Sequence, residues 1–203
     1  MNMKRQTLIR ELFAGSRKAY DDQALGVFAE MVEEAHAHGE GFAWVRKASG
    51  LIVQEGPWHN TVCTAGKNAA LDAYLAGSSY TVTGPYMGLI SSASYSAIAA
   101  ADTMSSHAGW LEAGNANAPT YTAPRKTCAW SAASSGSKAL SAALAFAITG
   151  SGTVKGCFLV FGTGAVSTVD NTAGTLYSAG LFTGGDKSVV NTDTLNVSYT
   201  GSL

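Results

Sequence analysis

The sequence predicts a mainly β protein: an antiparallel, jelly-roll-like β-sandwich with an N-terminal helical extension and one short helix at about 65–76. Residues 153–203 consist of short runs of β-branched, aromatic and leucine side chains, separated by Gly, Asn, Asp and Ser, which favour turns. Residues 195–199 alternate apolar and polar side chains, which is typical of a strand with one buried face. The chain offers about eight or nine such strands, the number that a jelly roll needs.

The first 40 residues have a different pattern. About half of the formally charged residues lie within the first 47 positions. Apolar residues recur there at helical spacing and predict amphipathic helices at about 5–14 and 22–37. Helices this short are marginal alone, so their apolar sides should dock on the β domain or on a neighbouring subunit. We therefore divide the chain into a charged amphipathic helical arm, 1–40, and a β-sandwich domain, 41–203. The arm contains the candidate interface residues Leu8, Leu12, Phe13, Leu25, Phe28 and Val32.

The β domain is expected to begin with a hairpin. Strands at 42–46 and 51–55 flank a turn that contains Gly50. Pro57 should end the second strand or leave it at a sheet edge, because proline cannot donate a ladder hydrogen bond. A helix follows over 65–75, and the apolar run 86–90 is interpreted as a central strand.

The middle of the chain is predicted to be mostly connection, from 91 to 124. It has room for one helical turn within 97–104 and a brief strand at 110–112. Strand candidates follow at 125–132 and 139–149. In the second candidate Leu144, Phe146 and Ile148 should face inward, although the alanines at 139–147 also allow a helix.

Composition argues against several function classes. The net charge is −1 and only 13% of residues are charged, so there is no electrostatic case for direct nucleic-acid binding. No apolar run approaches the roughly 20 residues of a membrane span, and no secretory leader is visible. Cys63, Cys128 and Cys157 are far apart in sequence and are interpreted as small buried hydrophobic residues with reduced thiols. We expect a soluble protein that is synthesised in the cytoplasm and does not bind a membrane.

No catalytic residues are expected. Asp102, His107 and Glu112 form the one acid–base cluster inside the domain, but no Gly-x-Ser-x-Gly nucleophile motif accompanies it. Asp102 is better interpreted as a turn or helix cap and Trp110 as a core anchor. Ser135 and Lys138 have the Ser-x-x-Lys spacing without any companion motif, so the protein is predicted not to be an enzyme.

No metal site and no cofactor are expected either. His36 and His38 lie near Glu33, Glu34 and Glu40, but they do not share a helix face, and a solvated helix end explains them better. Turn aspartates that could bind a hard cation lack the dense ligand series of a calcium loop; they are Asp170, Asp186 and Asp193.

Aromatic and basic residues leave binding surfaces open as alternatives. The aromatic residues could include a sugar-stacking platform, although burial in a core is their ordinary explanation. They are Trp44, Trp58, Trp110, Trp130, Tyr80, Tyr86, Tyr95 and Tyr121. Arg125 and Lys126, which follow Pro124, are candidates for an intersubunit contact.

Several short motifs together resemble a group of tailed-bacteriophage virion proteins. They begin with Asn60-Thr61-Val62, Ala65-Gly66-Lys67-Asn68 and Tyr86-Met87-Gly88-Leu89-Ile90. They continue with Ala101-Asp102-Thr103-Met104, His107, Gly109-Trp110, Glu112 and Pro124-Arg125-Lys126. They end with Gly156, Phe158, Gly174, Leu176, Gly180, Phe182 and the run from Asp193 to Thr200. The resemblance covers roughly 42–203, and capsid cement or decoration proteins with a jelly-roll fold are the relatives that it implies.

That resemblance implies a non-enzymatic virion structural protein. The expected role is capsid decoration: the protein would stabilise the shell from its surface through intersubunit contacts. Its expected partners are the major capsid protein, copies of itself, or both. The alternative is a tail or fibre module that binds a host receptor or a glycan. A hydrolase would need a clustered acid pair or a triad, and neither is visible in the sequence.

Overall fold

The computed structural model describes residues 37–75 and 83–202, and residues 37–202 belong to one compact unit. The helices predicted within 1–36, and with them the six apolar interface residues of the arm, lie outside the described residues. Strand β1 begins at His38, so residues 38–40 belong to the sheet and not to the arm.

The described residues form twelve strands and one helix, α2 (Thr64–Leu75). All strand pairings are antiparallel, which confirms the mainly antiparallel β class. The strands are β1 (His38–Arg46), β2 (Ile52–Val62), β3 (Tyr86–Ser91), β4 (Glu112–Ala113), β5 (Lys126–Thr127), β6 (Ser137–Ala139), β7 (Leu144–Ala147), β8 (Gly152–Phe161), β9 (Thr175–Leu181), β10 (Lys187–Val189), β11 (Thr194–Val197) and β12 (Thr200–Ser202).

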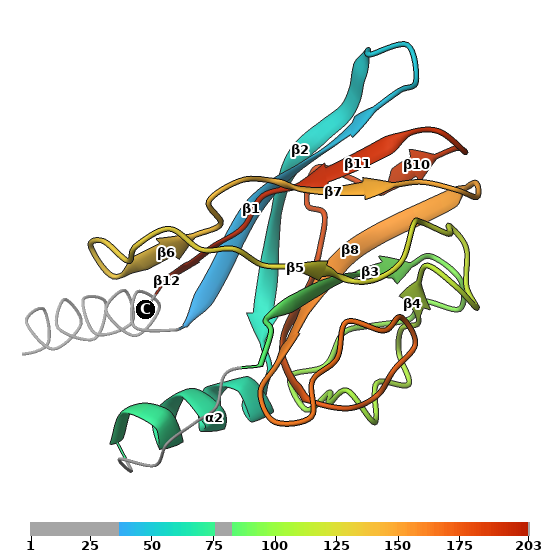
Figure 1. Cartoon of the computed structure of the whole chain (residues 1–203). Helices are drawn as coiled ribbons and strands as arrows, with labels where there is room; N and C mark the ends of the chain where they lie inside the picture. The colour runs from blue at the N-terminus through green and yellow to red at the C-terminus, as the bar shows by residue number, and fades with distance from the viewer. Residues whose placement is uncertain (1–36, 76–82, 203) are drawn as a thin grey trace, which may run out of the picture. The chain divides into compact units, whose positions relative to one another are not determined.

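These strands belong to one curled sheet. Its main order is β4-β3-β8-β9-β2-β1-β11-β7; β10 pairs with β8, β5 with β3, and β12 with both β1 and β6 (Figure 1). The sheet curls so far that strands from its two ends share one core. Met87 of β3 and Phe146 of β7 lie in the same buried cluster as Leu159 of β8 and Trp58 of β2, from the middle of the sheet. Tyr121, from the long connection before β5, packs edge-on against Phe146 at 5.1 Å.

A second buried cluster lies on the other face of β3, β8 and β9. Ile90, Phe158 and Leu176 point away from the inner core and are covered by Met104 and Trp110 from the long connection 92–111. Strand β8 is therefore buried on both faces, which explains why its sequence is a nearly continuous apolar run instead of an alternating one. The same reasoning applies to β3, and its prediction as a central strand is confirmed.

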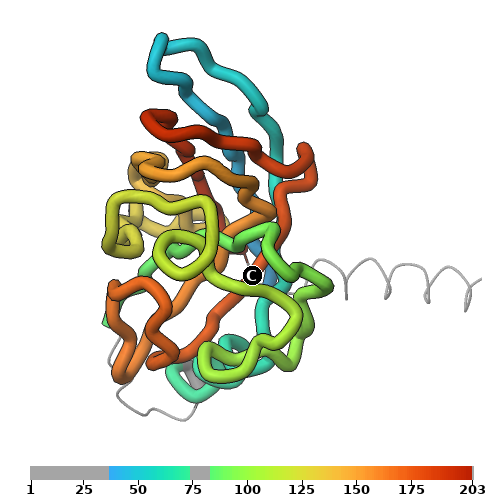
Figure 2. Tube along the Cα trace, turned by 90° about the vertical axis from the view of Figure 1, so that its right-hand side faces the viewer, coloured from blue at the N-terminus to red at the C-terminus, as the bar shows by residue number. Residues whose placement is uncertain are grey.

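The predicted hairpin is confirmed, and it extends beyond the rest of the sheet (Figures 1 and 2). Gly50 has φ +87° in its turn, a conformation that L side chains rarely adopt. Strand β2 continues through Pro57, whose carbonyl accepts a hydrogen bond from the N–H of Gly184. The ladder to β9 begins only at His59, so Pro57 faces a loop on that side. The strand neither ends at Pro57 nor lies at an edge of the sheet, because β2 stands between β9 and β1.

The connecting regions depart from the sequence interpretation. Helix α2 is confirmed, but 97–104 contains a turn closed by Asp102 N–H and Ala99 O instead of a helical turn. Only Lys126–Thr127 of the candidate 125–132 is a strand. In β7 the inward-facing Phe146 is buried, while the alanines on either side are exposed, so the alternation predicted for this segment is confirmed.

Candidate functional site: a buried ion-pair network

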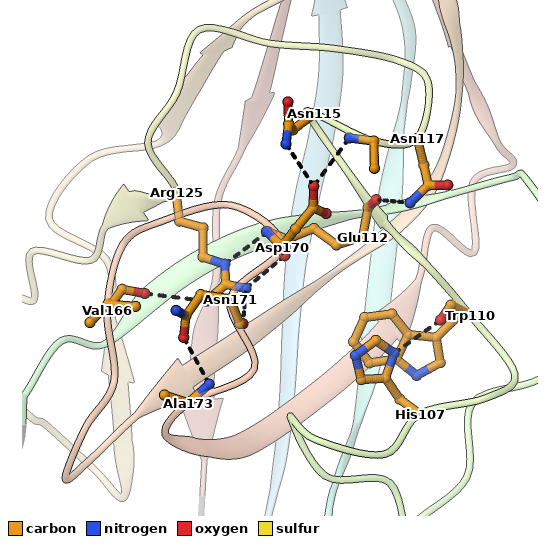
Figure 3. Close-up of polar contacts among 11 residues, drawn as sticks. His107, Trp110, Glu112, Asn115, Asn117, Arg125, Val166, Asp170, Asn171 and Ala173 are labelled. Atoms are coloured by element: carbon orange, nitrogen blue, oxygen red, sulfur yellow. Dashed lines mark hydrogen bonds and ion pairs between the residues drawn. The ribbon is translucent and has the colours of Figure 1, made fainter.

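The most elaborate polar arrangement in the described residues is a buried ion pair between Glu112 of β4 and Arg125, which lies just before β5 (Figure 3). Arg125 Nε donates to Glu112 Oε1 at 2.8 Å, and Arg125 Nη2 donates to Glu112 Oε2 at 2.6 Å. Arg125 is only 1% exposed and Glu112 only 6%. This bidentate geometry is the strong, directional form of an arginine–carboxylate contact.

Arg125 also connects the pair to the loop between β8 and β9. Its Nη1 donates to the carbonyl of Val166 at 3.2 Å, and its Nη2 donates to the carbonyl of Asn171 at 2.7 Å. The guanidinium lies 5.3 Å from the centre of the Phe158 ring, which adds a cation–π contact. The charge is therefore fully partnered inside the domain.

Asp170 joins the network from the same loop. Its backbone N–H donates to Glu112 Oε2 at 2.8 Å, and its carboxylate accepts from Asn115 Nδ2 and from the N–H of Ala116 (Figure 3). Asp170 has φ +63°, a left-handed conformation that aspartate tolerates better than most residues. Glu112, Arg125 and Asp170 thus tie together three segments that are far apart in the sequence.

The electrostatics of the network favour a structural role. Burial raises the pKa of the Glu112 carboxyl, whereas the Arg125 guanidinium and the Asp170 N–H oppose that rise. Three donors bind the carboxylate, and both side chains of the ion pair are buried. The arrangement can hold segments in register, but a substrate could not reach either charged group without opening the fold.

The structure corrects the interface prediction for Arg125. A residue that is 1% exposed cannot contact another subunit, and its charge is already paired. Lys126 is half-buried: its Nζ donates to the carbonyl of Thr122 and lies 5.7 Å from the centre of the Tyr121 ring. The interface prediction for Lys126 remains a prediction.

The predicted acid–base cluster does not converge on one site. Asp102 accepts hydrogen bonds from Trp110 Nε1 and from the N–H of Ala99, each at 2.9 Å. The ring of His107 stacks on Trp110 at 3.9 Å, and its Nδ1 lies 3.0 Å from the Trp110 carbonyl (Figure 3). Glu112 belongs to the separate ion pair. The predictions of Asp102 as a turn residue and of Trp110 as a core anchor are confirmed.

The remaining candidates are dispersed. Ser135 and Gly136 form a hairpin tip with φ +51° and +75°, before Lys138 in β6. Asp193 pairs with Lys47 at 2.6 Å, and Asp186 pairs with Lys155 at 2.9 Å. Within 37–75 and 83–202, no three His, Cys, Asp or Glu side chains come together as metal ligands would. His36 and Tyr80 lie outside the described residues.

The candidate aromatic platform divides between core and surface. Trp58, Trp110 and Tyr121 are buried, whereas Trp44, Trp130, Tyr86 and Tyr95 are half-buried. Tyr95 contributes to a shallow depression of about 360 Å³, which lies over β2 and β9 on the outer side of the sheet. Its lining includes His59, Thr61, Tyr95, Ile98, Leu181 and Thr183.

Sequence reasoning named Glu112 and Arg125 but did not pair them. A usable signal existed: Glu112 is the only acidic residue between positions 103 and 137, and Arg125 is one of only two basic residues there. Lys187 was missed altogether. Its side chain is fully buried, and its Nζ has no hydrogen-bond partner among the described residues.

Comparison with known proteins adds no relative to these observations. No family model, curated protein or solved structure matches the chain. Among the helices of the described segments, none is long and apolar enough to cross a lipid bilayer. The geometry of the described residues therefore carries the functional argument.

Proposed function

We propose that this chain is a capsid cement protein, a non-enzymatic structural component of a tailed-bacteriophage particle. The observation that carries the proposal concerns the motifs behind the resemblance to virion proteins, because they build the buried framework of the domain. Asp102 binds Trp110, Arg125 binds Glu112, and Phe158 lies beneath the guanidinium. The resemblance therefore concerns residues that hold the domain together, which is what a structural protein would retain.

The use of polar groups supports the same proposal. An active site needs acidic, basic or nucleophilic groups that reach a shared point in a cleft. In this domain the inward-facing charges of Glu112 and Arg125 are saturated by internal partners, and Asp102 and His107 are engaged with Trp110. These contacts stiffen the domain, as a protein that resists mechanical load requires.

In this proposal the curled sheet is a variant of the jelly roll of cement proteins, and the domain sits on the capsid surface. The arm reaches the major capsid protein or a neighbouring copy through its apolar residues, and Lys126 contributes at the domain surface. Each contact is modest, but symmetry repeats it over the shell, so the combined stabilisation is large.

The experiment that tests the proposal is protein stoichiometry in purified particles that are separated into heads and tails. Hundreds of copies in the head fraction are expected for a cement protein. Deletion of residues 2–36, which spares strand β1, should abolish particle binding and leave the sheet folded by circular dichroism. A few copies confined to tails, or undiminished binding after the deletion, would refute the cement role.

A tail or fibre module that binds a glycan is the second candidate, and the depression near Tyr95 favours it. The depression combines an aromatic ring with the hydroxyls of Thr61 and Thr183 and the imidazole of His59, which are groups that contact saccharides. Glycan-array binding that is lost in Tyr95→Ala and kept in Tyr86→Ala would support this module. The cement proposal predicts that neither the wild-type protein nor these two variants bind glycans.

A further inference from the structure

The outer face of β1 is a part of the sheet that no described segment covers. Over β3, β8 and β9 the outer face is buried beneath residues of the 92–111 connection. Along β1, by contrast, outward and inward side chains alternate, and the outward ones from His38 to Arg46 are exposed or half-buried. The same sheet is therefore covered on one part of its outer side and open on the other.

This open face carries large apolar side chains. Phe42 is 41% exposed and lies next to Trp44 on the same side of β1, with ring centroids 6.3 Å apart. Ile52, opposite Arg46 in the hairpin, is 43% exposed. Asn196 of β11 lies directly opposite Trp44. An apolar cluster of this kind on a soluble domain marks an interaction surface.

The charges at the two ends of this row indicate which partner fits. After His38, the outward side chains of β1 read Glu40, Phe42, Trp44 and Arg46, so this stretch of the row is a negative charge, two aromatic rings and a positive charge. Neither Glu40 nor Arg46 has an ion-pair partner among the described residues. The row is self-complementary about Ala43. When a second row lies against it in the opposite direction, Glu40 faces Arg46 and Phe42 faces Trp44.

We propose that this face binds a second copy of the chain across a twofold axis that lies in the interface, perpendicular to β1 at Ala43. Two sheets that stack face to face lie about 10 Å apart, and their strands cross at about 30°. In the antiparallel arrangement Phe42 packs on Trp44 of the second copy, and Glu40 meets its Arg46. A parallel stack would instead oppose like charges, which excludes the other simple arrangement.

Charge reversal in the full-length chain tests this geometry by sedimentation equilibrium at neutral pH. The wild type should dimerise, and Glu40→Arg and Arg46→Glu should each weaken the dimer by about tenfold or more, because each places like charges together. The double variant E40R/R46E restores opposite charges in the twofold arrangement, so it should recover most of the affinity. Trp44→Ser should abolish the dimer.

Lys67→Glu provides the matched control, since it reverses an exposed charge on α2 and should leave the dimer unchanged. Thermal unfolding of every variant separates loss of dimer from loss of fold. A monomeric wild type, a dimer that is indifferent to both single reversals, or a double variant as weak as the singles would each overturn the proposal. The dimer is a property of the purified chain, so its failure would not bear on the capsid role.

Discussion

The side-chain amide of Gln54 pairs with the backbone of Ser188 through two hydrogen bonds, in the way that one strand pairs with another. Gln54 Nε2 donates to the Ser188 carbonyl at 2.7 Å, and the Ser188 N–H donates to Gln54 Oε1 at 2.6 Å. Strand β2 pairs with β9 only from His59 onward. Strand β10 pairs with β8 and not with β2. Gln54 therefore connects β2 to β10 where no backbone ladder joins them.

Replacement of Gln54 should loosen β10 selectively. Gln54→Ala removes both hydrogen bonds and should lower the free energy of unfolding by about 1–2 kcal/mol, with faster hydrogen exchange at the Ser188 N–H. Gln54 has φ +51°, so Gln54→Gly relieves a backbone cost of about 1 kcal/mol and should be milder than Gln54→Ala. A glycine variant less stable than the alanine variant would contradict this account.

The Glu112–Arg125 pair yields a stronger prediction. Glu112→Gln leaves the Arg125 charge buried and under-partnered, so urea denaturation should show a loss of about 3–5 kcal/mol. The double variant E112L/R125M removes both charges and replaces them with apolar groups of similar size. It should lose clearly less than the sum of the two single variants, because an uncompensated buried charge, not the missing pair, is what destabilises the fold.

Glu55→Gln is the matched control for the ion pair, since it neutralises an exposed carboxylate and should change the stability by less than about 0.5 kcal/mol. Strict additivity of the Glu112 and Arg125 substitutions would show that the two groups do not interact. A Glu112→Gln variant as stable as the wild type would show the same.

The three thiols should be unreactive in the folded protein. Burial raises the pKa of Cys128 to about 12, and burial together with the nearby Asp102 carboxylate raises that of Cys63 to about 11. Cys157 is fully buried, and burial raises its pKa well above the ordinary value. Ellman's reagent at pH 8 should therefore label none of them natively and all three in guanidinium chloride. Rapid native labelling of any one would show that its segment opens.

Sequence patterns predicted the elements whose environment is periodic. Residues 195–199 alternate because one face of β11 is buried, and 86–90 form a continuous apolar run because β3 is covered on both faces. The two-residue strands β4 and β5 have too few residues to show any period, and non-local contacts define them. The curl of the sheet likewise brings β3 and β7 into one shared core, which no local pattern encodes.

The candidate site was predictable only in part, for the same reason. The contacts of Glu112 with Arg125 and with the Asp170 N–H span 13 and 58 residues. Taken alone, Glu112 was therefore only one member of an acid–base cluster without a nucleophile motif, and Arg125 was a candidate for an intersubunit contact. The inward position of Lys187 could in principle be predicted from the sequence. Lys187 lies two residues from the apolar Val189 in one strand, so the two side chains point to the same side of the sheet.

Lys187 should destabilise the fold at neutral pH. Its ammonium has no hydrogen-bond partner among the described residues, and it lies 5.7 Å from the centre of the Phe182 ring, which compensates only partly for lost hydration. Lys187→Met retains the length of the side chain and removes the charge, so it should raise the free energy of unfolding by about 2 kcal/mol. Lys155→Met is the control, because Lys155 is partly exposed and paired with Asp186.

The same group should make stability depend on pH in a definite direction. Burial lowers the pKa of Lys187 below its ordinary value of 10.5, although the neighbouring Asp186 carboxylate opposes the shift. Between the two values Lys187 binds more protons in the unfolded chain than in the folded one, so the destabilisation that it causes should diminish as pH increases toward 10. The three buried thiols, whose pKa values are raised, act in the opposite direction over the same range. Denaturation of wild type and Lys187→Met from pH 7 to 10 isolates this effect, because all other groups titrate in both proteins. The stability gap between them should narrow as pH rises; a constant gap would mean that Lys187 keeps its ordinary pKa in the fold.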